Sequence, residues 1–201
     1  MSRNSGLKSY VVMGMGAVVL GFMVTFWMGY NTLVEKEEQV MSSWSQVESN
    51  LQRELDLLPN LVKVVKTYAK HEKELLTEIT ALRSDADKLL NENDSLPNET
   101  QIAKVGKLQK SLDASFLKLF AVAENYPDLK SSEQFLQLQS QIEGAENRIN
   151  ITRMQFNDSV GSFNATMRTL PTNIIASIGD FQRKGYFKAQ SEAHEKLDLG
   201  L

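Results

Sequence analysis

The sequence predicts an all-α protein with a single N-terminal transmembrane helix followed by an elongated antiparallel bundle of long helices. Residues 10–30 carry no charged side chain and are rich in Val, Met, Phe and Leu. Beyond residue 40, apolar residues recur at intervals of three and four, the spacing of one helical face. No β-hairpin signal interrupts this pattern. We therefore divide the chain into a short flank (1–9), a transmembrane helix (10–30), a helical bundle domain (31–171), and a short helix with a flexible C-terminal tail (172–201).

The uncharged segment is long enough to cross the membrane as a helix. A bilayer core about 30 Å thick needs about 20 apolar residues. Tyr10, Trp27 and Tyr30 lie near the two ends of the segment, where amphipathic rings favour the headgroup layer. A cleaved signal peptide is the alternative, but residues 28–31 do not form the small-residue cleavage site that it would need.

The charges that flank this segment predict its orientation. Arg3, Lys8 and the amino terminus precede it, whereas residues 35–38 contribute three Glu and one Lys. Positively charged flanks stay in the cytoplasm. We therefore expect the domain that follows the membrane helix to be exported.

Small residues recur at every fourth position along the transmembrane segment. These are Ala17, Gly21, Thr25 and Gly29. Such a face lets two helices approach closely and gain van der Waals contact, which predicts a homo-oligomer. The alternative is that these residues only reflect the high frequency of small residues in membrane helices.

The domain begins with two predicted helices. The first continues outward from the membrane along Val40, Trp44 and later apolar positions to Leu58, where Pro59 interrupts or kinks it. The second runs from Leu61 to Leu89 as a heptad seam typical of a coiled coil, with Glu72 as its one polar intruder. Turn-forming residues at 91–97 end it.

Two further helices and a short one complete the domain. The third carries an apolar stripe over 102–123 and stops before Pro127, with a turn at 125–128. Ser131 and Gln134 have the spacing of a capping box, which starts a fourth helix that continues to Leu170. Residues 173–179 predict one more short apolar turn.

Composition excludes several functions. The chain has a formal net charge of -3 and no cysteine, so we expect no nucleic-acid binding and no thiolate chemistry. His71-Glu72 begins a zinc-protease motif, but Leu75 stands where the second histidine is needed. Glu-x-x-His pairs typical of ferritin-like metal sites are also missing. We expect no catalytic residue, no metal, no cofactor and no enzymatic activity.

Polar residues near the apolar seams form the remaining candidate site. Charges buried in a bundle are costly unless they are paired. We interpret these residues as a buried polar network that fixes helix register, and a metal or ligand site is the alternative. The network comprises Arg53, Asp56, His71, Glu72, Arg83, Glu146, Arg148, Arg153, Asn157 and Asn164.

Longer ordered motifs cover nearly the whole chain and resemble those of the LemA family. This chain differs from the family pattern at Arg53-Glu54, where paired arginines are frequent, and at Leu58, where Ile is frequent. The matching motifs are Tyr30-Asn31-x-Leu33-Val34, Gln52-Arg53-x-x-Asp56-Leu57-x-Pro59-Asn60-Leu61-Val62, Val65-Lys66-x-Tyr68-x-x-His71-Glu72, Glu124-Asn125-Tyr126-Pro127-Asp128-Leu129-Lys130, Glu146-Asn147-Arg148-Ile149 and Phe156-Asn157-x-x-Val160.

The resemblance implies a bacterial single-pass membrane protein with an extended α-helical domain and no established enzymatic activity or cofactor. It implies the inner membrane as the location, and it also allows a domain that faces the cytoplasm. The expected partners are the lipid bilayer, further copies of the chain and a protein at the membrane. We expect a self-associating scaffold or structural protein. The alternative is an accessory client-binding module for an envelope protease or signalling protein.

Overall fold

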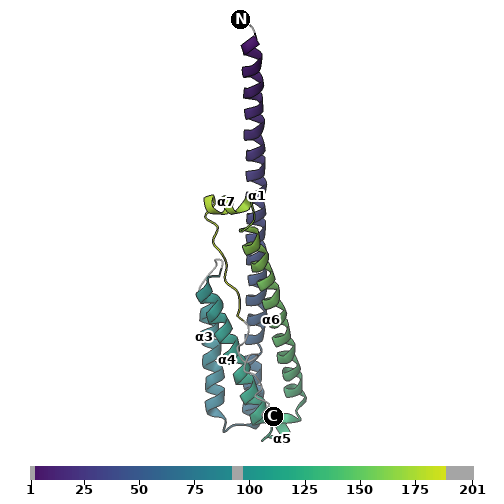
Figure 1. Cartoon of the computed structure of the whole chain (residues 1–201). Coiled ribbons are helices and arrows are strands. Elements are labelled where there is room, and N and C mark those ends of the chain that lie inside the picture. The colour runs from purple at the N-terminus through teal and green to yellow at the C-terminus, as the bar shows by residue number, and fades with distance from the viewer. Residues whose placement is uncertain (1–2, 92–96, 189–201) are drawn as a thin grey trace, which may run out of the picture. The chain divides into compact units, whose positions relative to one another are not determined.

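The computed structural model describes residues 3–91 and 97–188, and it confirms the all-α fold class (Figure 1). Residues 1–2, 92–96 and 189–201 lie outside this range, so the predicted tail is covered only in part. The described residues form helices and no strand. The helices are α1 (Arg3–Leu55), α2 (Leu58–Tyr68), α3 (Lys73–Asn91), α4 (Glu99–Ala123), α5 (Pro127–Lys130), α6 (Glu133–Thr166) and α7 (Thr172–Ile178).

The chain divides into two compact units. Unit 1 comprises residues 1–40 and 159–184, and unit 2 comprises residues 41–158 and 185–201. Because α1 and α6 are continuous helices, each contributes residues to both units.

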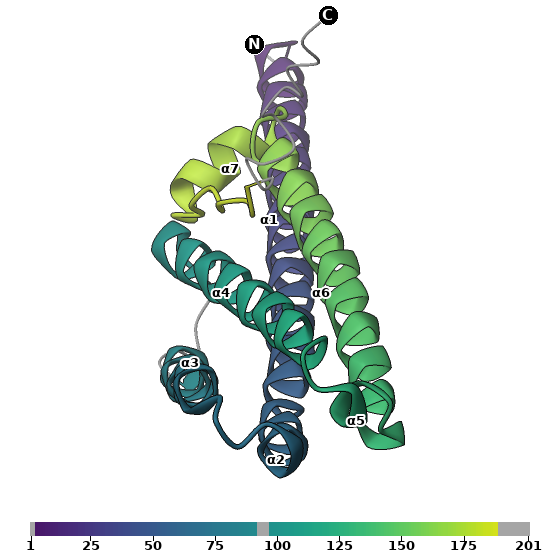
Figure 2. The same cartoon turned by 90° about the horizontal axis from the view of Figure 1, so that it is seen from below.

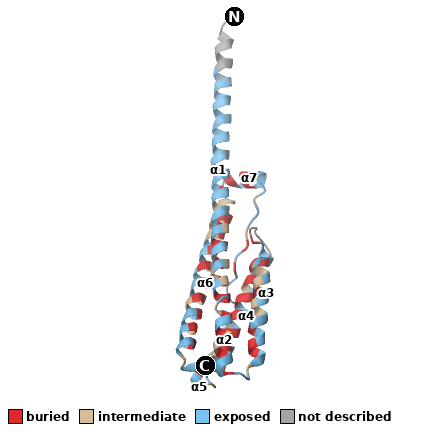
Figure 3. Cartoon of the chain, turned by 180° about the vertical axis from the view of Figure 1, so that it is seen from behind, coloured by how far each residue is buried: buried red, intermediate tan, exposed pale blue. Residues whose placement is uncertain are grey.

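The core of unit 2 is built from the apolar stripes of α1, α4 and α6, with α3 packed beside α4 (Figure 2). Burying each large apolar side chain contributes about 1.5–3 kcal/mol. The buried positions recur along one side of each helix (red in Figure 3). They include Trp44, Val47, Leu51, Leu55, Leu108, Leu112, Phe116, Leu119, Ile142, Ile149 and Phe156.

The first predicted boundary is close to the observed one. Helix α1 runs without a break for 53 residues and ends at Leu55, shortly before the predicted end at Leu58. Pro59 then lies in the first turn of α2, where a missing N–H costs nothing because that group has no helical partner.

The prediction of one helix from Leu61 to Leu89 is wrong, because the chain turns a corner between α2 and α3. Ala69 leaves the helical region with φ -117° and ψ 62°. Glu72, the polar residue of the seam, lies at this corner and accepts a hydrogen bond of 3.1 Å from the Tyr126 hydroxyl. The apolar spacing continues through the corner because both helices bury one face, and spacing alone does not mark a change of direction.

The later helices agree with the prediction except at their ends. Helix α4 matches the predicted third helix, and Asn98 caps it by accepting a 2.8 Å hydrogen bond from the Gln101 N–H. Helix α6 is capped by Ser132, whose hydroxyl oxygen accepts from the Phe135 N–H at 3.2 Å, so the cap lies one residue beyond Ser131. Helix α6 ends at Thr166 rather than at Leu170.

Unit 1 combines an apolar helix with a short crossing helix. The N-terminal part of α1 contains a stretch with mean hydropathy 1.8, none of it buried. Among the described residues, α1 alone is long and apolar enough to cross a membrane. Helix α7 lies across α1, where Ile175 contacts Gly29 (Figure 1). The rings of Tyr30 and Phe181 meet edge to face at 5.5 Å, and Lys184 forms a 2.6 Å ion pair with Glu37.

Candidate functional site

Three carboxylates from three different helices meet inside unit 2. Glu54 comes from α1, Asp113 from α4 and Glu146 from α6, and one oxygen from each lies within 4.8 Å of the other two. The helices place them there because each residue lies on or beside a buried stripe. Glu54 continues the buried stripe of α1 three residues after Leu51 and beside Leu55, so its side chain points into the core.

Burial makes this arrangement of carboxylates costly in free energy. Glu54 is 0% exposed, and neither of its carboxylate oxygens has a hydrogen-bond partner. The Oδ1 atom of Asp113 is likewise buried without one. A buried polar atom that has lost its water without gaining a partner costs about 1–3 kcal/mol, and more if it is charged.

Burial raises the pKa of all three carboxyl groups, and neighbouring carboxylates add to the rise for Glu54 and Glu146. Burial, reinforced by Asp113 and then by Glu146, raises the pKa of Glu54 to about 8 from 4.5. Burial also raises the pKa of Asp113, although the nearby charge of Arg153 opposes the change. The pKa of Glu146 rises because of burial, then Asp113 and Glu143. At neutral pH, Glu54 is therefore mostly protonated.

Arg153 is the nearby positive charge, and several contacts hold it in place. Its guanidinium donates a 2.9 Å hydrogen bond to Gln109 Oε1 and a 3.4 Å hydrogen bond to the carbonyl of Lys188. It also lies over the ring of Phe187, 4.8 Å from the centroid. Burial lowers the pKa of Arg153, and Asp113 opposes that change.

Two asparagines of α6 hold the segment that follows α7. In unit 2, Asn157 donates to the carbonyl of Phe187 at 3.1 Å and accepts from its N–H at 2.9 Å. In unit 1, Asn164 makes the same pair of bonds with Lys184, at 2.9 and 3.0 Å. We call each of these paired contacts an asparagine clasp.

The spacing of the two clasps follows from backbone geometry. Asn157 and Asn164 are one heptad apart, and seven helical residues rise about 10.5 Å. Lys184 and Phe187 are three residues apart, and three extended residues span about 10 Å. One helix face can therefore meet successive sites on an extended segment.

The residues predicted as a single polar network lie in several separate places. Glu146 and Arg153 belong to the carboxylate cluster, Asn157 and Asn164 form the clasps, and Glu72 bonds Tyr126. Arg83 lies 3.9 Å from Asp87 in an ion pair. The exposed members are Arg53, Asp56, His71 and Arg148.

The prediction omitted Glu54 and Asp113. Glu54 occupies a seam position between Leu51 and Leu58, and Asp113 directly follows the buried Leu112. Assigning every residue of each helix to a face would have shown both acids, because a charged residue inside an apolar stripe stands out against the pattern.

The predicted packing face of the membrane segment is only partly open. Ala17, Gly21 and Thr25 are exposed, and a side chain added at Gly21 would meet nothing within 4 Å. Gly29 instead faces Ile175 of α7 in the same chain.

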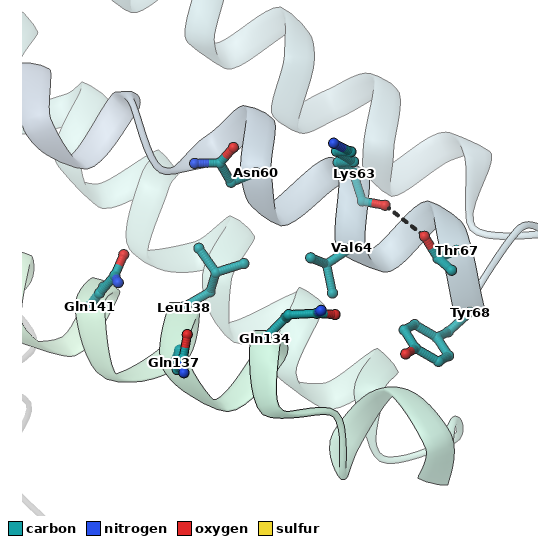
Figure 4. A pocket seen from close by; sticks show the side chains of 9 residues that line it. All are labelled: Asn60, Lys63, Val64, Thr67, Tyr68, Gln134, Gln137, Leu138 and Gln141. Carbon is teal, nitrogen blue, oxygen red and sulfur yellow. Dashed lines mark hydrogen bonds between the residues drawn. The ribbon is translucent and has the colours of Figure 1, made fainter.

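An open groove of about 460 Å³ lies between α2 and the N-terminal part of α6 (Figure 4). Amide side chains dominate its lining, together with two apolar residues, an aromatic ring and one lysine. The lining residues are Asn60, Lys63, Val64, Thr67, Tyr68, Gln134, Gln137, Leu138 and Gln141.

The profile of the LemA family matches residues 43–199, which is most of the chain. The chain belongs to the LemA family. The matched region includes all three carboxylates and both clasps, and the membership agrees with the resemblance seen in the motifs.

The chain is similar in sequence to magnetosome proteins called MamQ and to a protein called LemA. The magnetosome protein MamQ of Magnetospirillum gryphiswaldense is 26% identical over 194 residues, which cover 89% of this chain and 69% of MamQ. Magnetosome protein MamQ 2 of Paramagnetospirillum magneticum is 26% identical over 85% of this chain and 68% of its own length. Protein LemA of Metamycoplasma hominis is 27% identical over 84% of this chain and 72% of its own length.

The raised pKa of Glu54 predicts that unit 2 becomes less stable as pH rises. Between 4.5 and about 8 the folded chain holds a proton on Glu54 that the unfolded chain releases, so the free energy of unfolding falls by up to about 1.4 kcal/mol per pH unit. Asp113 and Glu146 act in the same direction. Urea unfolding in chelator-containing buffer at pH 5, 6.5 and 8 measures this.

The Glu54→Gln variant tests the assignment of that slope. Because the amide cannot ionise, this variant should lose much of the slope and exceed the wild type in stability at pH 8. Asp158→Asn, which changes an exposed acid on the same helix as Glu146, is the matched control and should keep the slope. A wild-type stability that is flat from pH 5 to 8 would contradict the prediction.

The clasp at Asn157 should contribute measurably to stability. Asn157→Ala leaves the N–H and the carbonyl of Phe187 without their partner, which should cost about 1–3 kcal/mol and speed hydrogen exchange at the Phe187 amide. Asn150→Ala, at an exposed position of α6, should change stability by less than about 0.5 kcal/mol. Equal exchange rates at Phe187 in both variants would show that the clasp does not hold the segment.

Proposed function

We propose that this LemA family protein is a non-enzymatic, single-pass membrane protein that self-associates as a scaffold at the bacterial inner membrane, with its helical domain exported. The observation that carries the proposal is the exposed apolar surface of α1. Large side chains such as Val18 and Phe22 are 73% and 66% exposed, and no segment of the described chain covers them. Lipid must cover most of this surface, because water does so only at high cost.

The small-residue face gives the membrane helix a place to pair with a second copy. Thr25 donates its hydroxyl to the carbonyl of Gly21 at 2.8 Å, so its polar group is satisfied within the helix. Ala17, Gly21 and Thr25 therefore present a smooth face that a second helix can approach closely. Gly29 does not contribute, since α7 packs on it.

The second candidate function is that of an accessory client-binding module for an envelope protease or signalling protein. The groove between α2 and α6 favours it (Figure 4). Its amides can donate and accept hydrogen bonds to the backbone of an extended peptide, and Val64 and Leu138 provide apolar contact.

The oligomer mass tests the scaffold directly. Full-length protein in native-like lipid particles should give a discrete oligomer by native mass measurement. A chain beginning at Asn31 should give a monomer, because the membrane helix has been removed. A full-length monomer would contradict self-association and favour the client-binding module.

Point variants locate the contact. Gly21→Ile should dissociate the oligomer, because the larger side chain keeps two helices apart. Val19→Ile, which changes an exposed residue on another face, should leave the mass unchanged. If both variants stay oligomeric, the small-residue face is not the contact.

A further inference from the structure

The carboxylate cluster has the composition of a cation site. Its three oxygens come from three helices and lie within 4.8 Å of one another. Points at that separation lie about 2.8 Å from their common centre, close to the 2.3–2.6 Å at which oxygen ligands bind Ca²⁺. Small side-chain rotations would bring all three oxygens to bonding distance.

The cluster also leaves the side chain of Glu54 without a hydrogen-bond partner. Glu54 is fully buried, and both of its oxygens lack a hydrogen-bond partner although one of them points at Asp113 and Glu146. A side chain that only fixed helix register would be satisfied by a neighbouring donor. A partner for these oxygens must accept electron pairs, as a cation does, because the nearest ligand atoms are themselves carboxylate oxygens.

The charge balance favours a divalent ion. When ionised, the three carboxylates carry three negative charges, and Arg153 supplies one positive charge nearby. The guanidinium of Arg153 is held by contacts with Gln109, Phe187 and Lys188. Two negative charges remain, which one divalent cation neutralises. Ligands made only of carboxylate oxygen favour hard ions such as Ca²⁺, Mn²⁺ and Mg²⁺ over Zn²⁺.

We propose that Glu54, Asp113 and Glu146 bind one divalent cation of the oxygen-preferring class inside unit 2 and so link α1, α4 and α6. The site is structural, because its ligands come from three different helices and one of them, Glu54, is fully buried. Ca²⁺ or Mn²⁺ fits the spacing better than Mg²⁺, which demands shorter and more regular bonds.

The test uses full-length protein in detergent after treatment with a chelator. Electron paramagnetic resonance of added Mn²⁺ should show about one bound ion per chain, and Ca²⁺ should compete for it. At a hundredfold excess over the dissociation constant, the ion should raise the unfolding temperature by about 4 °C or more. Absence of binding by any of the three ions at millimolar concentration would overturn the proposal in favour of a shared proton.

Variants distinguish Mn²⁺ binding at the cluster from nonspecific binding to other acidic residues. Glu54→Gln should abolish Mn²⁺ binding while circular dichroism shows that the fold is retained, and Asp113→Asn should weaken binding at least tenfold. Glu143→Gln removes an acid one turn from Glu146 and should bind Mn²⁺ like the wild type. Binding that survives Glu54→Gln would place the ion elsewhere and overturn the assignment.

A different observation concerns α7, which carries three distinct faces. Thr172, Ile175 and Ala176 are buried, and Ile175 contacts Gly29 of α1. On one flank of this contact lie Ile174 and Ile178, which are 53% and 66% exposed. On the other flank, helical spacing places the exposed polar residues Asn173 and Ser177.

The place of α7 explains why a helix would expose an apolar flank. Gly29 lies near the end of the uncharged run of α1, which continues to Val34 before Glu35, and α7 crosses α1 at the level of Gly29 (Figure 1). A helix that crosses a membrane-spanning helix at its end lies in the plane of the lipid headgroups. Leu170, which precedes α7 in the turn before Pro171, is also exposed, at 77%.

We infer that α7 is an interfacial helix whose apolar flank, Ile174 and Ile178, inserts into the boundary between headgroups and acyl chains, an inference that rests on the proposed membrane anchor. The polar flank then faces water, as in other interfacial helices. The exposed Arg168 and Arg183 flank the helix in the sequence and suit anionic headgroups.

Spin labels can test this cleanly because the chain has no cysteine of its own. Single spin labels are attached at Ile174→Cys and Ile178→Cys in full-length protein in lipid bilayers. Oxygen, which partitions into lipid, should accelerate the spin relaxation of these two labels. A water-soluble nickel complex should instead accelerate the relaxation of the matched label at Ser177→Cys. A label at Val19→Cys tests whether the N-terminal part of α1 lies in lipid, in which case it should be accessible to oxygen.

The outcomes separate the two levels of the inference. Nickel-accessible labels at Ile174 and Ile178, with an oxygen-accessible label at Val19, would overturn the interfacial role of α7 and leave the membrane anchor intact. A nickel-accessible label at Val19 would overturn the anchor and, with it, the role of α7.

Discussion

The continuous apolar stripe of α1 is the constraint on which the rest of the structure depends. The N-terminal part of α1 is long and apolar, and as a helix it satisfies its backbone hydrogen bonds internally. The same helix continues without a break to Leu55, and its buried residues from Leu33 onward pack in both units. Along this one helix the side chains change from exposed apolar residues near its start to a one-sided buried stripe further on.

Much of the fold could be predicted from the sequence because helical periodicity reports burial directly. The membrane helix, α4 and the course of α6 follow from apolar spacing and from Pro127. The corner at Ala69 could not be predicted, because both α2 and α3 bury one face and the seam runs through the break with its spacing unchanged. The cap at Ser132 differs by one residue from the predicted Ser131, since both serines precede suitable residues and only the geometry decides between them.

The candidate site was harder to predict than the fold. Glu146 and Arg153 were recognised as polar residues near a seam, but which residues face them depends on how three helices pack. Glu54 lies inside an apolar stripe, whereas the neighbouring Arg53 and Asp56, which the sequence also offers as polar candidates, are exposed. The sequence alone shows that charged residues lie near a core. Only the packing shows that three acids share one space while a single arginine stands nearby.

The segment held by the asparagine clasps has a consequence for how the protein is made. Phe187 stacks on Trp44 at 5.9 Å and meets Phe156 edge to face at 5.4 Å, so an aromatic residue near the end of the chain completes a cluster that begins in the first soluble turns of α1. A ribosome that has synthesised α1 through α6 has not yet released this ring. The core of unit 2 therefore closes only once residue 187 has been made and released, and a chain that stops shortly before Phe187 leaves Trp44 without the ring that covers it.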